Sequence, residues 1–388
     1  MKFDSPLRAS GMGFRYRSRH TALAFLVVSA FASLACGSGE GAGNRDRPYE
    51  GSDASKPVGS GGDAKEASGI PAGWSILELT PNLGSDAELE RISCVADRYC
   101  MILAFTKHER GLLQATTVTY ADGDIGKPVQ VAPYRDTQGA SIACSSSSFC
   151  MLLTSVSRFY TWDGSSWTVH DEGESEAARE GGTSLTCPAD NRCFAVGQSA
   201  DSALVLEYDG SGWTKQELPR DNVEGVATDI SCSSPSDCYL LTNAGQLWRY
   251  GGSTWGNPTS PTVTDSQSSE DPIASISCTQ GPLCIAAGSV GGGLLVDSGA
   301  GFKARSQIEV LHTTVPGSCG SPRFCLVQPM RKDGPPTDYA IFDGSRLSPV
   351  NAPPDTIFSI SCTSDRFCMG RPLEPAASGP SVFIYNGG

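Results

Sequence analysis

Cysteine is the residue type whose spacing points most directly to chemistry in this 388-residue chain. Fourteen of the fifteen cysteines form seven pairs, and five residues separate the two members of each pair. The pairs are Cys94 with Cys100, Cys144 with Cys150, Cys187 with Cys193, Cys232 with Cys238, Cys278 with Cys284, Cys319 with Cys325, and Cys362 with Cys368. A zinc site needs four converging ligands, and each pair has no partner nearby in the sequence. We therefore expect seven disulfides and no metal or cofactor.

Other candidate catalytic groups are scattered. The histidines beyond residue 35 are His108, His170 and His312, each in a different repeat. No HExxH, GxSxG or phosphate-binding loop motif is present. An acidic run could attract Ca²⁺, although solvation is the favoured explanation; it contains Asp171, Glu172, Glu174 and Glu176. We predict no catalytic residue from these patterns, while scattered carboxylates of a glycosidase or lyase would leave no linear motif.

Four arginines recur at nearly the same place within the loops that the cysteine pairs bracket. They are Arg98, Arg192, Arg323 and Arg366. A catalytic arginine triad would draw different positions from different repeats, so this recurrence indicates a structural role.

The cysteine pairs mark a repeat. Their first members follow one another at steps of 41 to 50 residues, and a period of about 40–50 residues is the size of one β-propeller blade. Each repeat contains four short β-rich runs separated by turn residues, as in 185–218, without helical periodicity. Asp-Gly or Asn-Gly turns between the third and fourth runs suit tight hairpins.

The two ends of the repeat region complement each other. Residues 381–388 supply a third strand with its turn but no fourth strand, whereas 74–79 supply a fourth strand alone. We expect an all-β, seven-bladed β-propeller over 74–388 with four-stranded blades, in which the N-terminal strand closes the last blade. Such closure, similar to that of WD40-type propellers, removes exposed sheet edges.

Aromatic residues flank the hairpin turns, and we expect them to pack between blades. The turns at Asp163 and Asp209 resemble the Asp-box of sialidase-type propellers, although Trp167 and Trp213 follow four positions later instead of five. In that family the motif is a structural turn.

The repeats carry a common Ile-Ser-Cys sequence, clearest at Ile230–Cys232, Ile276–Cys278 and Ile360–Cys362. Residues 74–388 resemble secreted bacterial propellers built from Ile-Ser-Cys-x5-Cys blades. The resemblance implies the fold and no activity.

The N-terminal region has the features of an export signal. Basic residues precede the apolar run Thr21–Ala35, which is too short to span a bilayer, so residues 1–35 are expected to be a signal peptide starting at Met1 or Met12. Ala32–Cys36 resembles the bacterial lipobox, which implies lipidation of Cys36. An ordinary signal peptide with a chance cysteine is the alternative. Residues 36–73, rich in Gly and Ser, should form a disordered tether.

The amino-acid composition limits the classes of molecule that the exported chain could bind. Removal of residues 1–35 leaves 24 Lys and Arg against 41 Asp and Glu, a net charge of −17. This charge opposes binding to nucleic acid or anionic lipid, and an exported chain fits the disulfides.

We therefore expect a monomeric lipoprotein of the bacterial cell envelope, at the outer membrane or cell surface in preference to the inner membrane. Its propeller is expected to be a non-enzymatic binding module for a protein, peptide or glycan. Long variable loops opposite the disulfide-bearing turns would provide the binding face. The alternatives are a carbohydrate-active hydrolase or lyase with its site in the central pocket, and a scaffold subunit.

Overall fold

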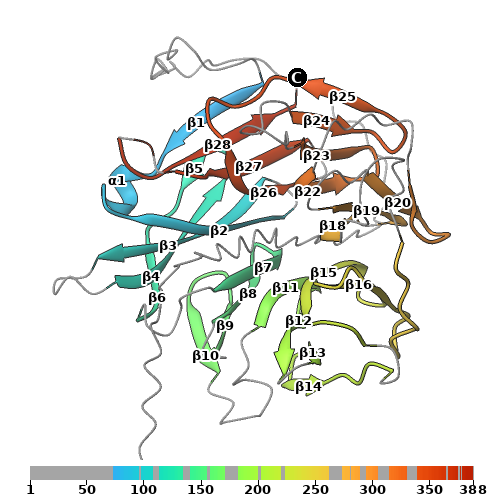
Figure 1. Ribbon diagram of the computed structural model, residues 1–388. Coiled ribbons are helices and arrows are strands. Elements are labelled where there is room, and N and C mark those ends of the chain that lie inside the picture. The colour runs from blue at the N-terminus through green and yellow to red at the C-terminus, as the bar shows by residue number, and fades with distance from the viewer. Residues whose placement is uncertain are drawn as a thin grey trace, which may run out of the picture.

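The chain folds into seven antiparallel sheets, as seen in a computed structural model (Figure 1). The structure describes residues 73–387 except 96–97, 108–112, 134–139, 155–157, 171–181, 200–201, 220–222, 262–272, 280, 289–293, 305–313, 330–338, 364–365, 375 and 377. The expected signal peptide, the expected tether up to residue 72 with Cys36, the acidic run, His108 and His312 lie outside these residues. No helix in the described part is long and apolar enough to cross a membrane.

Each sheet is one blade, numbered 1 to 7 along the chain from the sheet that contains β2. The first strand of each blade lies innermost and contacts the first strands of the two adjacent blades, and β26 contacts β2 to complete the ring. These inner strands are β2 (Glu88–Val95), β7 (Ser141–Ser146), β11 (Gly182–Ala189), β15 (Ala227–Ser234), β18 (Ile273–Cys278), β22 (Thr314–Ser321) and β26 (Ile357–Cys362). The second strands are β3 (Tyr99–Lys107), β8 (Phe149–Leu153), β12 (Arg192–Ser199), β16 (Asp237–Thr242), β19 (Leu283–Gly288), β23 (Phe324–Pro329) and β27 (Phe367–Pro372).

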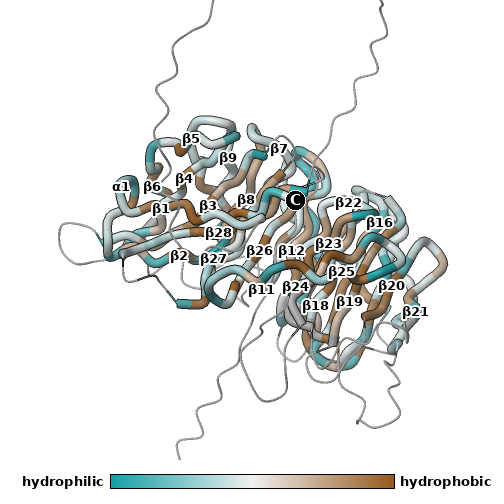
Figure 2. Tube along the Cα trace, turned by 90° about the horizontal axis from the view of Figure 1, so that it is seen from above, coloured by the Kyte–Doolittle hydropathy of each residue, from teal (hydrophilic) through white to brown (hydrophobic). Residues whose placement is uncertain are grey.

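Third and fourth strands continue each blade outward. The third strands are β4 (Leu113–Ala121), β9 (Phe159–Trp162), β13 (Ser202–Tyr208), β17 (Leu247–Tyr250), β20 (Leu294–Ser298), β24 (Tyr339–Phe342) and β28 (Ser381–Asn386). The outermost strands are β5 (Asp124–Ile125) with β6 (Val129–Pro133), β10 (Trp167–His170), β14 (Trp213–Lys215), β21 (Lys303–Ala304), β25 (Leu347–Val350) and β1 (Trp74–Glu78). Hydrophobic residues concentrate along the strands, while hydrophilic residues mark many turns (Figure 2).

Blade 4 departs from the expected four strands, because its sheet has three strands within the described residues. Trp255 and Thr259 pair with β17 through isolated bridges to Tyr250 and Leu247. Trp255 and Thr259 are four positions apart whereas their partners are three apart, so the two bridges are out of register by one residue and no continuous fourth strand forms.

The expected ring closure is confirmed. Strand β1 pairs with β28 from Trp74 opposite Tyr385 to Glu78 opposite Ser381, so it is the fourth strand of blade 7. In Figure 1 the blue β1 lies beside the red β28. Trp74 is buried against Tyr339, Phe383 and Tyr385. The short helix α1 (Thr80–Leu83) follows, and the backbone N–H of Leu79 donates to the Pro380 carbonyl at 2.8 Å.

Seven disulfides join the cysteines in the expected pairs, with Cα–Cα distances of 3.9–4.1 Å. They bond Cys94 to Cys100, Cys144 to Cys150, Cys187 to Cys193, Cys232 to Cys238, Cys278 to Cys284, Cys319 to Cys325, and Cys362 to Cys368. Each bond joins the first and second strands of one blade, so none crosses from one blade to another.

The disulfides are buried, and their cysteines are at most 3% exposed. Each of the seven hydrophobic clusters combines the disulfide of one blade with the middle strands of the preceding blade. The disulfides therefore belong to the cores between blades, in addition to bridging their own hairpins.

The serine of the Ile-Ser-Cys sequence faces the opposite way from its neighbours, because side chains alternate along a strand. Its hydroxyl accepts the N–H of the first cysteine in an adjacent blade at 2.7–3.0 Å. The accepting residues are Ser93, Ser231, Ser277, Ser318 and Ser361. The motif thus links consecutive blades through Ile and Cys on one side and Ser on the other.

The turns of each blade define two faces of the ring. The Asp122 N–H donates to the Arg98 carbonyl, and the Gly387 N–H donates to the Arg366 carbonyl, so the hairpin turns meet the disulfide-bridged turns. We call this side the disulfide face. The side that carries the links between second and third strands and between successive blades is the loop face.

Candidate functional site

The loop-face ends of the inner strands share a distortion. Six of the seven inner strands have a register shift just before the Ile-Ser-Cys position, in β2, β11, β15, β18, β22 and β26. Such β-bulges redirect side chains and are frequent at rims and next to sites. The residues that immediately precede the Ile-Ser-Cys position are Arg91, Ser141, Ser184, Asp229, Ser275, Pro316 and Ser359. Arg91 and Asp229 are therefore charged residues at a position where other blades carry mainly serine.

Asp229 is fully buried between blades 3, 4 and 5. Its carboxylate accepts hydrogen bonds from the Ser184 hydroxyl at 2.9 Å and from the backbone N–H groups of Ile230 and Ile276 at 2.9 and 3.0 Å. Burial raises the pKa of Asp229 to about 7, although the three donors act in the opposite direction. These donors occupy the carboxylate and assign it a structural role in joining three blades.

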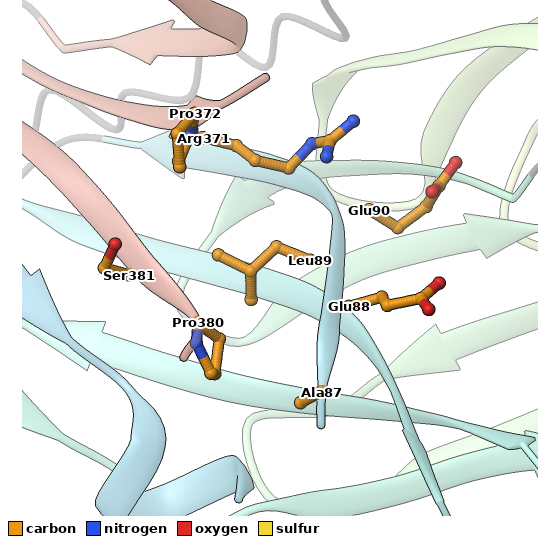
Figure 3. A pocket seen from close by; sticks show the side chains of 8 residues that line it. All are labelled: Ala87, Glu88, Leu89, Glu90, Arg371, Pro372, Pro380 and Ser381. Atoms are coloured by element: carbon orange, nitrogen blue, oxygen red, sulfur yellow. The ribbon is translucent and has the colours of Figure 1, made fainter. Parts of the chain in front are cut away.

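A pocket of about 270 Å³ lies on the loop face between blades 7 and 1. It is lined by Ala87, Glu88, Leu89, Glu90, Arg371, Pro372, Pro380 and Ser381 (Figure 3). The contacts of Leu79 and Thr80 with the segment at Ser378–Pro380 hold one wall in place. The pocket therefore depends on the same chain segment that closes the ring.

Two arginines share one aromatic ring beside this pocket. The Arg371 guanidinium lies 4.1 Å from the centre of the Phe358 ring, and that of Arg91 lies 5.7 Å from it. Phe358 is the bulged residue of β26. Burial lowers the pKa of Arg371 to about 10 and also lowers the pKa of Arg91. Both cations are therefore partly desolvated and close to each other.

One carboxylate accompanies the two arginines. Glu90 lies 3.7 Å from the Arg91 guanidinium, and its charge favours the protonated form of Arg371 without an ion pair to it among the described residues. Glu88 is exposed. Its charge adds a small contribution to the raised pKa of Lys107, which is caused mainly by the hydrogen bond with Asp86. In Figure 3 the side chains of Arg371 and Glu90 extend to the same side. The buried part of the site thus holds two cations and one anion.

Two buried polar atoms at this site, Arg371 Nε and Ser359 Oγ, have no hydrogen-bond partner among the described residues. Ser359 is directly opposite Arg371 in the pairing of β26 with β27, so both side chains lie on the same side of the blade. Buried polar groups are nearly always satisfied, and exceptions require a physical explanation.

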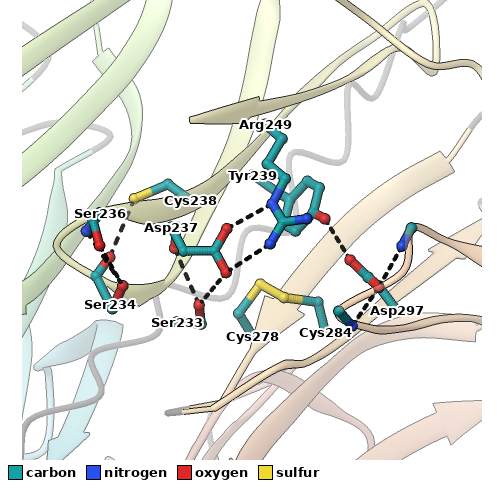
Figure 4. A network of polar contacts seen from close by, with 12 residues as sticks. Ser233, Ser234, Ser236, Asp237, Cys238, Tyr239, Arg249, Cys278, Cys284 and Asp297 are labelled. Atoms are coloured by element: carbon teal, nitrogen blue, oxygen red, sulfur yellow. Dashed lines mark hydrogen bonds and ion pairs between the residues drawn. A yellow bond between two sulfur atoms is a disulfide. The ribbon is translucent and has the colours of Figure 1, made fainter. Parts of the chain in front are cut away.

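A second pocket, of about 570 Å³, lies between blades 4 and 5 near the disulfide face and includes Tyr239, Arg249 and Phe302. Its polar groups bind one another (Figure 4): Arg249 pairs with Asp237, and the Tyr239 hydroxyl donates to Asp297. Burial raises the pKa of Tyr239, and the hydrogen bond with Asp297 reinforces this effect. Because these partners are satisfied, we interpret the network as an interblade contact.

The residues predicted from the sequence take structural positions where they are described. His170 lies in the outermost strand of blade 2 and hydrogen-bonds Thr161. Arg98 and Arg192 lie over the rings of Phe367 and Phe194, each at 5.7 Å. No group of three or more His, Cys, Asp or Glu side chains that could hold a metal ion occurs within the described ranges.

The aromatic prediction is confirmed by stacked or edge contacts between adjacent blades, as in Phe159 with Trp213 and Phe194 with Tyr250. The hairpin aspartates organise turns. Asp163 accepts the Ser165 hydroxyl and the N–H groups of Ser166 and Ser165, and these hydrogen bonds lower the pKa of Asp163 to about 2.

Sequence reasoning missed the Arg91, Phe358 and Arg371 cluster. The available signal was Arg91 itself, since it replaces the serine found in other repeats immediately before the Ile-Ser-Cys position. No sequence pattern links Arg91 in the first repeat to Arg371 in the last repeat.

The fold is similar to those of solved propellers. YCF48 from Cyanidioschyzon merolae matches with a TM-score of 0.53 at 13% identity, covering 81% of this chain and 99% of that one. YCF48 bound to a D1 peptide matches with a TM-score of 0.53 at 13% identity and coverages of 82% and 98%. A chain of a mitotic checkpoint complex matches with a TM-score of 0.52 at 11% identity and coverages of 89% and 99%.

No protein-family model matches the sequence, and the comparison with curated proteins found no match. At these identities the likeness to solved structures concerns the fold alone: the chain is an all-β, seven-bladed propeller closed by its N-terminal strand.

Proposed function

We propose that this protein is an exported, lipid-anchored propeller that binds a protein or peptide at the pocket between blades 7 and 1. The observation that carries the proposal is Arg371, which lines the pocket and shares the Phe358 ring with the neighbouring Arg91, while Glu90 is the ion-pair partner of Arg91. Exposed Leu373 directly follows Pro372, which lines the pocket, and an exposed apolar side chain next to charged groups suits contact with a protein or peptide. That YCF48, a protein of the same fold, has been solved with a bound peptide supports this class of ligand.

The anchoring half of the proposal rests on Cys36, which follows the apolar segment Thr21–Ala35. Acyl chains on this cysteine would hold the protein at a membrane, since each buried methylene contributes about 0.8 kcal/mol.

Cys36→Ser is expected to move the protein from the membrane fraction to the soluble fraction of the envelope. Fractionation followed by immunoblotting measures this, with metabolic labelling by a fatty acid as a second readout. Cys36→Ser protein that still sediments with membranes and carries label would contradict lipidation at this residue.

Binding at the pocket is tested by placing a photo-crosslinking amino acid at Glu88, which is exposed and lines the pocket. In living cells this position is expected to give a discrete adduct with a protein or peptide, which mass spectrometry identifies. Exposed Arg323, in a disulfide-bridged turn, is the control position.

The same adduct must be lost when the Glu88 probe is combined with Arg371→Gln. Equal cross-linking from Glu88 and Arg323, or no adduct from Glu88, would overturn the proposed site. An adduct with a glycan would mean that the ligand of this site is a glycan and not a protein or peptide.

A further inference from the structure

The charge balance at the pocket between blades 7 and 1 is incomplete. Arg91 has Glu90 as its ion-pair partner at 3.7 Å, whereas Arg371 makes no ion pair among the described residues. Glu88 also lines the pocket, but its side chain is exposed, so solvent screens its charge and it compensates less of the buried charge than Glu90 does. One positive charge therefore remains uncompensated in a partly desolvated environment, where a single anionic group would be bound most strongly.

The positions of the side chains make Arg371 the residue that would bind this anion. Its guanidinium is stacked on Phe358 at 4.1 Å, which limits its rotation and orients its donors. The unpartnered Arg371 Nε and Ser359 Oγ are on the same side of blade 7, and Ser359 is 2% exposed. Together they offer a guanidinium fork and a hydroxyl donor, the set that a carboxylate accepts from.

Apolar residues form half of the pocket lining, which also includes Glu88 and Ser381. Ala87, Leu89, Pro372 and Pro380 form its walls next to Arg371. A volume of about 270 Å³ accommodates a small number of side chains and no large ligand. A dianionic phosphate suits the site less well than a monoanion, because Glu90 already balances one of the two cations.

We infer that Arg371 and Ser359 bind the C-terminal carboxylate of a peptide or protein whose last residue is apolar. The inference rests on the proposed function, since it names the group that the pocket recognises. In this arrangement the terminal carboxylate takes the Arg371 fork and the Ser359 hydroxyl. The terminal side chain lies among Ala87, Leu89, Pro372 and Pro380.

The test uses the full-length protein and synthetic peptide pools that end in Leu, Val or Phe, each prepared as the free acid and as the C-terminal amide. The free acids are expected to bind, and amidation should weaken binding at least about tenfold. Arg371→Gln should weaken free-acid binding by about tenfold to a hundredfold, because it removes a charge-assisted contact.

Three further variants keep the test selective. Arg371→Lys retains the charge but loses the fork, so it should give an intermediate loss. Ser359→Ala should weaken the free acids and leave the melting temperature unchanged, since its hydroxyl has no partner. Arg323→Gln makes the same charge change at an exposed position in a disulfide-bridged turn and should bind as the parent does.

Equal binding of acids and amides, undiminished binding by Arg371→Gln, or no binding of any pool would overturn the inference. If the Glu88 cross-link to a partner persists in that case, the proposed function stands and only the terminal carboxylate is wrong. If the cross-link is also absent, the site itself fails.

Discussion

Replacing Trp74 by alanine is expected to lower the free energy of unfolding by about 3–5 kcal/mol, the usual cost of removing a buried aromatic side chain. Trp74 is 6% exposed and packs against Tyr339 of blade 6 and Tyr385 of its own blade. Its indole N–H also donates to the Asn351 carbonyl at 2.6 Å. The residue therefore fastens the closing strand to two blades, and chemical denaturation under oxidising conditions measures the loss.

Ile76→Ala is the matched control, because Ile76 lies on the same strand and is 39% exposed. It should change stability by less than about 1 kcal/mol. Deletion of residues 74–79 should be more severe, since it unpairs β28 and opens the ring. A deletion variant that melts as the parent does would refute the closure as a source of stability.

Asp229→Ala is the second change with a large expected effect, a loss of at least about 3 kcal/mol near pH 6. The substitution leaves the N–H groups of Ile230 and Ile276 and the Ser184 hydroxyl without their acceptor, and each buried unsatisfied group costs about 1–3 kcal/mol. Ser359→Ala removes a hydroxyl at the equivalent position of blade 7, where no partner is lost. It should therefore leave the unfolding midpoint nearly unchanged, and similar effects of the two substitutions would contradict this account.

The pH dependence of stability tests the same carboxyl group. Because burial raises the pKa of Asp229 to about 7 from its ordinary value of 3.8, the folded protein binds a proton that the unfolded chain releases in this window. The stabilisation is complete below about pH 4 and is lost as the pH rises to about 7, with a slope of at most about 1.4 kcal/mol per unit.

Asp229→Asn isolates this contribution. The parent should lose stability relative to the variant as the pH rises from about 4 to about 7. A parent that gains stability over that range would mean that the three donors outweigh burial and hold the carboxylate ionised.

The sequence was sufficient to predict the fold because its signals are local and repeated. Cysteine spacing, hairpin turns and the complementary terminal strands each mark one element of every blade. Blade 4 was predicted less well, because a register shift of one residue between Trp255 and Thr259 interrupts its fourth strand and leaves no pattern in the sequence. The disulfide pairs were expected, but not their burial within the cores between blades, which depends on how neighbouring blades pack.

The pocket could not be predicted from the sequence for a physical reason. Arg91 and Arg371 meet only because the ring brings blade 1 next to blade 7 and because Phe358, the bulged residue of β26, lies close to both guanidinium groups. A bulge shifts a side chain without leaving a spacing pattern. Residues that act through such a contact look like ordinary strand residues in the sequence.

The serine hydroxyls between blades have a consequence for how the ring opens. Blade 2 carries Ala143 where other blades carry the hydroxyl, so the boundary with blade 3 lacks the hydrogen bond that Ser93 makes at the previous boundary. A closed ring has no end from which to fray, so its first opening must start at an internal boundary. Amide hydrogens of β7 and β11 should therefore exchange with solvent sooner than those of the other inner strands.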